Sequence, residues 1–178
     1  MPVPRRTVVL GVAAVAAASA VLGVKMARAQ GDIWREYRRE DLGFRIEMPG
    51  QPEITVEEAD DKDIWIRATD AEVNRDNNLF GAHCTEWKNV QSAEEQFELI
   101  REGIRKLGMS ATREVPMTMN GFPAREFIRA TEDYNFIHRL VVMEKLSIAA
   151  AVHGDPNMHS DPIVRRFFES FRLLRSAR

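Results

Sequence analysis

The fold is decided by residues 136–153, which read FIHRLVVMEKLSIAAAVH. Glu144 and Lys145 divide this stretch into two largely apolar runs, a pattern typical of two antiparallel strands joined by a short turn. Successive side chains of a strand point to opposite faces, and here both faces carry apolar residues. The stretch therefore predicts a strand pair that is covered by a layer on each side. One face holds Leu140, Val142 and Ala149, and the other holds Ile137, Val141, Ile148 and Val152.

Further strands are expected on the N-terminal side of this hairpin. Phe44, Ile46 and Met48 alternate with charged residues, which is the period-2 pattern of a half-buried strand. Asn120-Gly121 lies between two apolar-rich runs and predicts a second tight hairpin. The segments expected as strands are 34–37, 44–48, 64–73, 79–87, 112–119, 122–130, 136–143 and 146–153.

Two helices are expected between and after these strands. Ser92 and Glu95 form a capping box, and an apolar stripe then runs to Gly108, a residue that commonly ends helices. The second helix begins at Ser160-Asp161-Pro162 and carries an apolar stripe that includes Phe167. The order of elements predicts an α+β protein, in which helices pack on an antiparallel sheet.

The N-terminal segment 1–29 is typical of an export signal. Arg5-Arg6 precede an uncharged stretch, Thr7–Val24, and Ala27-Arg28-Ala29 matches a cleavage site before Gln30. We therefore expect a periplasmic or otherwise exported protein, with residues 30–178 forming one α+β domain. Two alternatives stay open at this point. Export could follow the twin-arginine or the general secretory route, and an uncleaved segment would anchor the chain in the inner membrane.

Charge excludes several classes of partner for the exported domain. Residues 30–178 contain 21 basic and 27 acidic residues, a net charge of −6. Nucleic-acid binding rests on neutralising phosphates, and docking on anionic lipid needs a basic surface. We therefore expect no nucleic-acid partner, and no membrane contact beyond a possible uncleaved N-terminal segment.

Three stretches of the exported chain form a recognisable series: GFRIEMPGQP at 43–52, NGFPARE at 120–126 and RFFESFRL at 166–173. Together they resemble the PsbP-like and DcrB-like family, and the resemblance spans nearly the whole exported chain. The resemblance implies an α/β/α sandwich, in which helices flank an antiparallel β-sheet. Relatives of this kind mostly bind other proteins or act as assembly factors, and they share no catalytic residues. No cofactor is implied.

Two histidines are the candidate metal ligands. If Glu144-Lys145 is a two-residue turn, His153 lies opposite Phe136, and His138 lies diagonally across on the same face. With Asp155 or His159 nearby, such a pair could bind zinc or a related metal. The alternative is two unrelated histidines, one of them at a frayed strand end.

A catalytic nucleophile is not indicated by the sequence. Cys84 is the single cysteine, and its neighbour His83 should point to the opposite face of the strand. Ser147 shares the face of His138, but it lies in an apolar strand without a nucleophile elbow. We expect Cys84 to be a buried small hydrophobe and the protein not to be an enzyme.

Acidic, aromatic and basic residues are the remaining candidates for binding. Glu57, Glu58, Asp60, Asp61 and Asp63 predict a solvated loop, and this loop could also bind calcium weakly or dock a basic partner. Trp34, Trp65 and Trp87 either anchor a partner at the surface or pack beneath a helix. Arg125, Arg129 and Arg139 either bind an anion or form ion pairs with Glu126, Glu132 or Asp133.

These observations favour a non-enzymatic periplasmic binding or accessory protein that contacts another envelope protein. The candidate contact residues are Trp65, Trp87, Asp60, Asp61 and Asp63. The competing hypothesis is a metal- or small-ligand-binding protein that uses His138 and His153.

Overall fold

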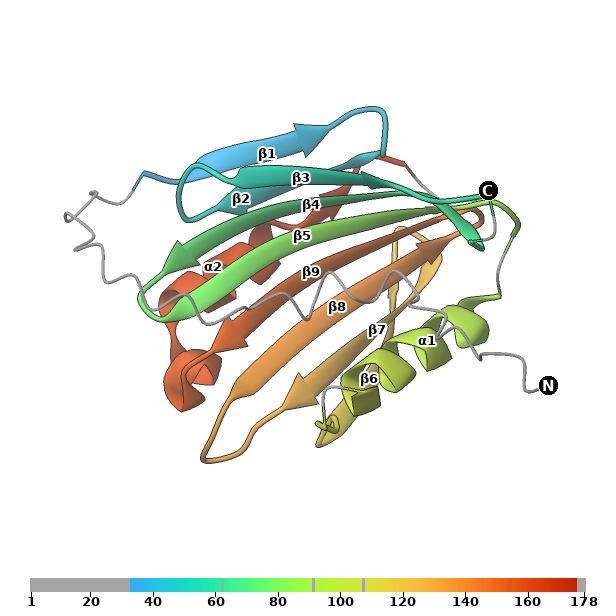
Figure 1. Ribbon diagram of the computed structural model, residues 1–178. Coiled ribbons are helices and arrows are strands. Elements are labelled where there is room, and N and C mark those ends of the chain that lie inside the picture. Colours follow the sequence, from blue (N-terminus) through green and yellow to red (C-terminus); the bar gives the residue numbers. More distant parts are fainter. Residues whose placement is uncertain (1–32, 62, 91, 107, 176–178) are drawn as a thin grey trace.

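A computed structural model describes residues 33–61, 63–90, 92–106 and 108–175 (Figure 1). Within these residues, seven strands form an antiparallel sheet in the order β3-β4-β5-β9-β8-β7-β6, and three form a smaller sheet in the order β1-β2-β10. The α+β class with mainly antiparallel sheet is confirmed. The strands are β1 (Arg35–Arg39), β2 (Phe44–Met48), β3 (Glu53–Glu58), β4 (Trp65–Arg75), β5 (Asn78–Trp87), β6 (Arg113–Met119), β7 (Phe122–Arg129), β8 (Asn135–Met143), β9 (Leu146–Gly154) and β10 (Arg172–Leu173). The helices are α1 (Ala93–Lys106), the 3₁₀ helix η2 (Pro156–Ser160) and α2 (Pro162–Ser170).

The expected export signal, residues 1–29, lies outside the described residues. Its predicted cleavage site before Gln30 lies outside them as well.

The hairpin β8–β9 lies in the middle of the large sheet, as its sequence predicts. Phe136 pairs with His153 and Val141 pairs with Ile148, so the two-residue turn and its register are confirmed. One face of the hairpin belongs to a buried cluster that includes Phe136 and Leu140, and the other belongs to a cluster that includes Val141. Burying a large apolar side chain stabilises a fold by roughly 1.5–3 kcal/mol, so this pair anchors both sides of the sheet.

Helix α2 covers one face of the large sheet. The Asp161 carboxylate accepts a hydrogen bond from the Ile163 N–H at 2.8 Å, and Pro162 follows it in the first turn, as predicted. Phe167 is fully buried and meets Phe80 of β5 edge-on, with ring centroids 5.4 Å apart. The small sheet β1-β2-β10 contributes to the same cluster through Phe44. Its separation from the large sheet is a feature that the strand patterns do not predict.

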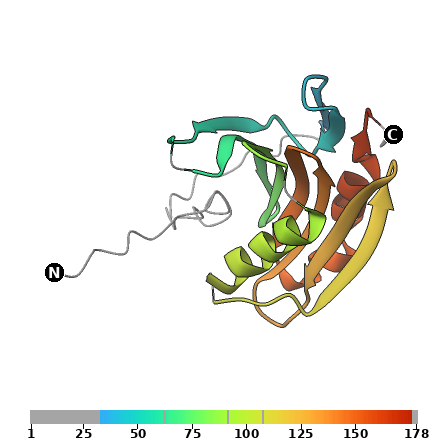
Figure 2. The same cartoon turned by 90° about the vertical axis from the view of Figure 1, so that its right-hand side faces the viewer.

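Helix α1 covers the opposite face of the large sheet from α2 (Figure 2). The capping box is confirmed, because Ser92 N–H donates to the Glu95 carboxylate and Glu95 N–H donates to the Ser92 hydroxyl. Phe97 and Ile104 are buried against β7 and β8. Gly108 follows the helix with a φ of 71°, the left-handed conformation expected at this position.

Strand β3 is an element that the sequence analysis does not anticipate. The expected acidic loop is wrong for Glu57 and Glu58, which lie on this strand and pair with Ala68 and Arg67 of β4. β3 forms one edge of the large sheet, and β6 forms the other (Figure 1). The remaining acids, Asp60, Asp61 and Asp63, lie in the β3–β4 turn region as expected.

We expect Gly154→Ala to lower the free energy of unfolding by about 3 kcal/mol. Gly154 has a φ of 153°, and an added Cβ would lie 2.5 Å from the Asn77 carbonyl oxygen. The matched control is Gly108→Ala, where φ is also positive but nothing lies within 4 Å of the added Cβ, so only about 1 kcal/mol should be lost. Urea denaturation measures both values, and equal losses would contradict the role assigned to the close approach at Gly154.

Candidate functional site

Two buried histidines meet on the face of the large sheet that α1 covers. The Nε2 atoms of His138 on β8 and His153 on β9 lie 2.7 Å apart, and the ring centroids lie 4.5 Å apart. Phe136 packs beside both rings. The predicted diagonal contact is therefore confirmed, and the two imidazoles form a hydrogen-bonded pair in which one nitrogen donates and the other accepts.

Burial keeps this histidine pair uncharged. It lowers the pKa of His138 well below 6.5, and the nearby His153 and His83 lower it further. The pKa of His153 is lowered to about 4, again mainly by burial and then by His83. Two imidazolium ions could not share a hydrogen bond, because neither nitrogen would have a lone pair to accept it. The pair is thus a polar contact that needs at least one neutral ring.

A third histidine, His83 of β5, makes a polar contact with β4. His83 Nδ1 lies 2.8 Å from the Asp70 carboxylate, which fixes the ring orientation and leaves Nε2 facing away. The ring lies over Gly81, where an added Cβ would come within 2.3 Å of His83 Nε2. Strand alternation alone does not reveal this contact, because it relates His83 only to its neighbour Cys84. The β4–β5 register, with Asp70 opposite His83, is the signal that would have found it.

The structure brings together the Nε2 atoms of His138 and His153, but the described residues do not supply a complete set of metal ligands. Over the described ranges of the chain, no three His, Cys, Asp or Glu side chains are grouped so that they could hold a metal ion. The predicted additional ligands are engaged elsewhere: the Asp155 carboxylate accepts from Asn157 N–H, and His159 Nε2 lies 3.1 Å from the Arg129 carbonyl. His138 and His153 alone could contribute two imidazole ligands.

Cys84 and Ser147 both lie in the core of the protein. Cys84 is buried on the α2 side of the sheet, where burial raises the pKa of its thiol, so the prediction of a buried small hydrophobe is confirmed. The Ser147 hydroxyl accepts a hydrogen bond from Trp87 Nε1 at 3.1 Å. Neither group is hydrogen-bonded to a histidine base among the contacts of the described residues.

Trp65 and Trp87 are buried and cannot serve as surface anchors. Their exposed fractions are 4% and 7%, and they form a cluster with Ala68, against which Leu99 of α1 packs. The expectation of a surface ring is wrong at both positions, and the alternative of packing beneath a helix is correct. At Trp65 the reason is a shift in the β4–β5 register between Trp65 and Arg67, which places this ring beside Ala68 and leaves Ile66 exposed. Trp87 is buried because Leu99 of α1 packs against the cluster on its face of β5.

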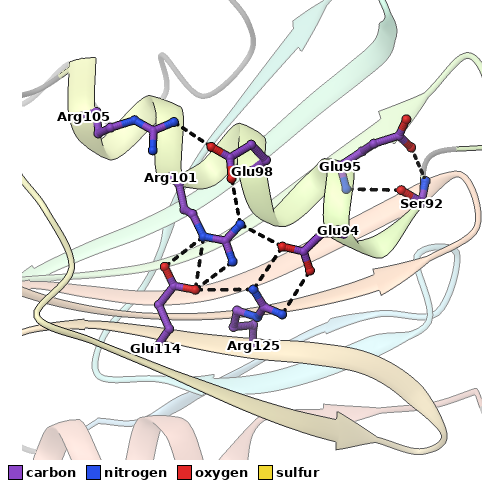
Figure 3. Close-up of polar contacts among 8 residues, drawn as sticks. All are labelled: Ser92, Glu94, Glu95, Glu98, Arg101, Arg105, Glu114 and Arg125. Carbon is purple, nitrogen blue, oxygen red and sulfur yellow. Dashed lines mark hydrogen bonds and ion pairs between the residues drawn. The ribbon is translucent and has the colours of Figure 1, made fainter.

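The predicted basic margin divides between the two faces of the sheet. Arg139 forms an ion pair with Glu126 at 2.7 Å, as one of the two interpretations expects. Arg129 donates to the Tyr134 and Ser110 carbonyls instead. Arg125 joins a network beneath α1, where it pairs with carboxylates that the sequence analysis does not connect (Figure 3). The members of this network are Glu94, Glu98, Arg101, Arg105, Glu114 and Arg125.

The acidic end of the sheet combines exposed charge with exposed apolar surface. All six residues of β3 are exposed, and Ile54 and Val56 keep 52% and 54% of their surface accessible. In the adjoining turn, the Asp63 carboxylate accepts from Asp60 N–H, while the Lys88 ammonium donates to the Asp60 and Asp61 carbonyls. Ile64 and Ile66 are also exposed at this end. Exposed apolar side chains gathered at one place mark a contact surface.

We expect the folded protein to lose stability between pH 6.5 and about 4 because of the histidine pair. The unfolded chain binds protons on both rings in this range whereas the folded pair does not, so unfolding is favoured as the pH falls. His153 alone accounts for about 3 kcal/mol. The double variant His138→Leu/His153→Leu should flatten this part of the curve of unfolding free energy against pH.

The control for this measurement is His159→Leu, since His159 is exposed and outside the pair. Its curve should keep the slope of the parent protein. An unchanged slope in the double variant would contradict the assignment of the acid sensitivity to His138 and His153.

Two comparisons bear on the family of this chain. None of the family models searched matches the chain, and none of the curated proteins searched matches it. The resemblance to the PsbP-like and DcrB-like family therefore stays a prediction.

Among the described helices, none combines the length and the apolar character that a membrane span requires.

Proposed function

We propose that this chain is a non-enzymatic binding or accessory protein that acts through contact with another protein. The proposal places it in the periplasm or otherwise outside the cytoplasm, with a partner from the cell envelope and with the α/β/α sandwich of the PsbP-like family. The export signal at 1–29 and the three family-like stretches support these parts. The contact surface is assigned to the acidic end of the large sheet.

One observation carries this proposal: exposed apolar residues lie beside exposed acidic residues at β3 and the β3–β4 turn. Ile54 and Val56 are more than half exposed. They lie on the edge strand β3, and apolar side chains on the inner strands of this sheet are mostly buried. Among the described side chains, no basic group forms an ion pair with Asp60, Asp61 or Asp63. An apolar centre with a charged rim is the usual composition of a protein interface.

A second candidate function is metal or small-ligand binding at His138 and His153. The observation in its favour is the approach of their two Nε2 atoms to 2.7 Å, which directs both nitrogens at one point. Two imidazoles that coordinate one metal at about 2.0–2.1 Å must separate somewhat further, and further ligands would come from solvent or from the ligand itself.

The protein-contact proposal predicts that neutralising the turn abolishes partner capture. The tagged full chain is cross-linked in its native cells and the captured proteins are quantified by mass spectrometry. Asp60→Asn/Asp61→Asn/Asp63→Asn should reduce the co-captured protein at least about tenfold, because three interfacial charges are lost. The control Glu132→Gln/Asp133→Asn removes exposed acids at the β7–β8 turn and should leave capture intact.

Two outcomes would contradict the proposal: equal capture by both variants, or a parent chain that is recovered alone at several cross-linker lengths. The same spectra locate the mature N-terminus. A peptide that begins at Gln30 indicates cleavage, and one that runs through Val24 indicates an anchor.

The metal hypothesis predicts stoichiometric binding of Zn²⁺, Ni²⁺ or Cu²⁺ that is lost in His138→Gln/His153→Gln. Equilibrium dialysis with elemental analysis measures the bound metal, and His159→Gln serves as the control with the histidine pair retained. Binding should weaken as the pH falls, because protons compete for the imidazole nitrogens. Absence of bound metal in the parent protein at neutral pH would end this hypothesis.

A further inference from the structure

The β3–β4 pair has two faces of different chemistry. On one face Ile54 and Val56 of β3 lie opposite Ala71 and Thr69 of β4. On the other face Glu53 lies opposite Glu72. Like charges at directly opposed positions destabilise a strand pair, and burial together with Asp70 and Glu53 raises the pKa of Glu72. His83 partly offsets this charge by its contact with Asp70, whereas Glu53 and Glu57 on the same face form no ion pair among the described side chains.

The outer edge of β3 offers free backbone groups on known residues. Ala59 N–H donates to the Ile66 carbonyl of the neighbouring strand, so the odd-numbered residues of β3 turn their backbone groups toward β4. Amide directions alternate along an antiparallel strand, and the N–H and C=O groups of Ile54 and Val56 therefore point away from β4. In the described residues β3 pairs with β4 alone. The edge is thus a template for one more strand.

Charge argues against a second copy of this chain as that strand. Antiparallel self-pairing centred on Thr55 would bring Ile54 against Val56, which is favourable for the apolar face. The same register would place Glu53 against Glu57 twice, and neither carboxylate has an ion-pair partner among the described residues. Charged residues on an edge strand are a common protection against self-association. They leave the edge open to a strand of opposite charge.

We propose that β3 binds an extended segment of a partner protein in which basic and apolar residues alternate, so that the segment becomes an eighth strand of the large sheet. The apolar residues of the segment pack on Ile54 and Val56. Its lysines or arginines lie on the opposite face beside Glu53 and Glu57. Backbone hydrogen bonds supply affinity in this mode, and the alternation supplies specificity. This inference rests on the proposed function, for which it names the kind of partner.

The test uses a labelled peptide, acetyl-KVKIKVK-amide, and the full chain, with binding measured by fluorescence anisotropy at low and high salt. The control peptide acetyl-KKVIVKK-amide has the same composition without strict alternation, and it should bind at least about tenfold more weakly, since it cannot match both faces at once. Val56→Pro removes an N–H that β4 does not use, so the strand should persist while affinity falls about tenfold.

Val56→Thr keeps both the N–H and the branched shape, and it is the matched control that should retain most of the affinity. Glu57→Lys should also weaken binding of the alternating peptide, and it keeps the test valid if Val56→Pro does not fold. Equal binding of the two peptides would overturn the proposal, because charge alone would then explain the affinity. A dimer of the parent chain in sedimentation that is lost in Val56→Pro would assign the edge to a second copy instead.

The native partner separates this inference from the proposed function. If Val56→Pro retains partner capture while Asp60→Asn/Asp61→Asn/Asp63→Asn loses it, the partner binds the turn and strand addition is wrong. If both variants retain capture of the partner, strand addition at β3 and the assignment of the contact surface to the acidic end of the sheet are both wrong.

Discussion

Burial of β8 and β9 on both faces is the constraint on which the rest of the molecule depends. A single covering layer buries only one of the two apolar faces of this strand pair. A helix therefore packs on each face. Helix α1 supplies Phe97 and Ile104 on one side, and α2 supplies Phe167 and Phe168 on the other. The positions of β5 and β7 follow, because each pairs with one member of this hairpin.

The two covered faces are built differently. The face under α2 is mostly aliphatic and aromatic, and its main polar contact is the Arg139–Glu126 ion pair beside Phe168. The face under α1 contains the histidine pair, the Trp87–Ser147 hydrogen bond and the Arg125 ion pairs. The network of Figure 3 fixes α1 over β6 and β7, but exposed ion pairs contribute little each. The Arg125 guanidinium also makes a cation–π contact, 4.4 Å from the centre of the Phe97 ring of α1. Polar groups thus give this face its specific geometry, and apolar burial gives it most of its stability.

The sequence predicts the central hairpin, the start of both helices, the closing Gly108 of α1 and the contact of His138 with His153, because short turns and caps determine register locally. It does not predict β3, where two apolar residues stand among acids and no core pattern develops. Nor does it predict the burial of Trp65, since a bulge shifts the strand alternation by one residue. The Asp70–His83 contact depends on the exact register of the β4–β5 hairpin, and the Arg125–Glu94 contact depends on how α1 packs on β7.

Strand order also has a consequence for the time at which this chain can fold. β5 must find β9, whose residues follow it by some seventy positions, and β2 must wait for β10 at Arg172–Leu173. A ribosome-bound chain therefore exposes the apolar faces of β2, β4 and β5 until β9 and β10 have been synthesised. Whatever binds the nascent chain during this interval encounters locally paired strands whose apolar faces are still uncovered.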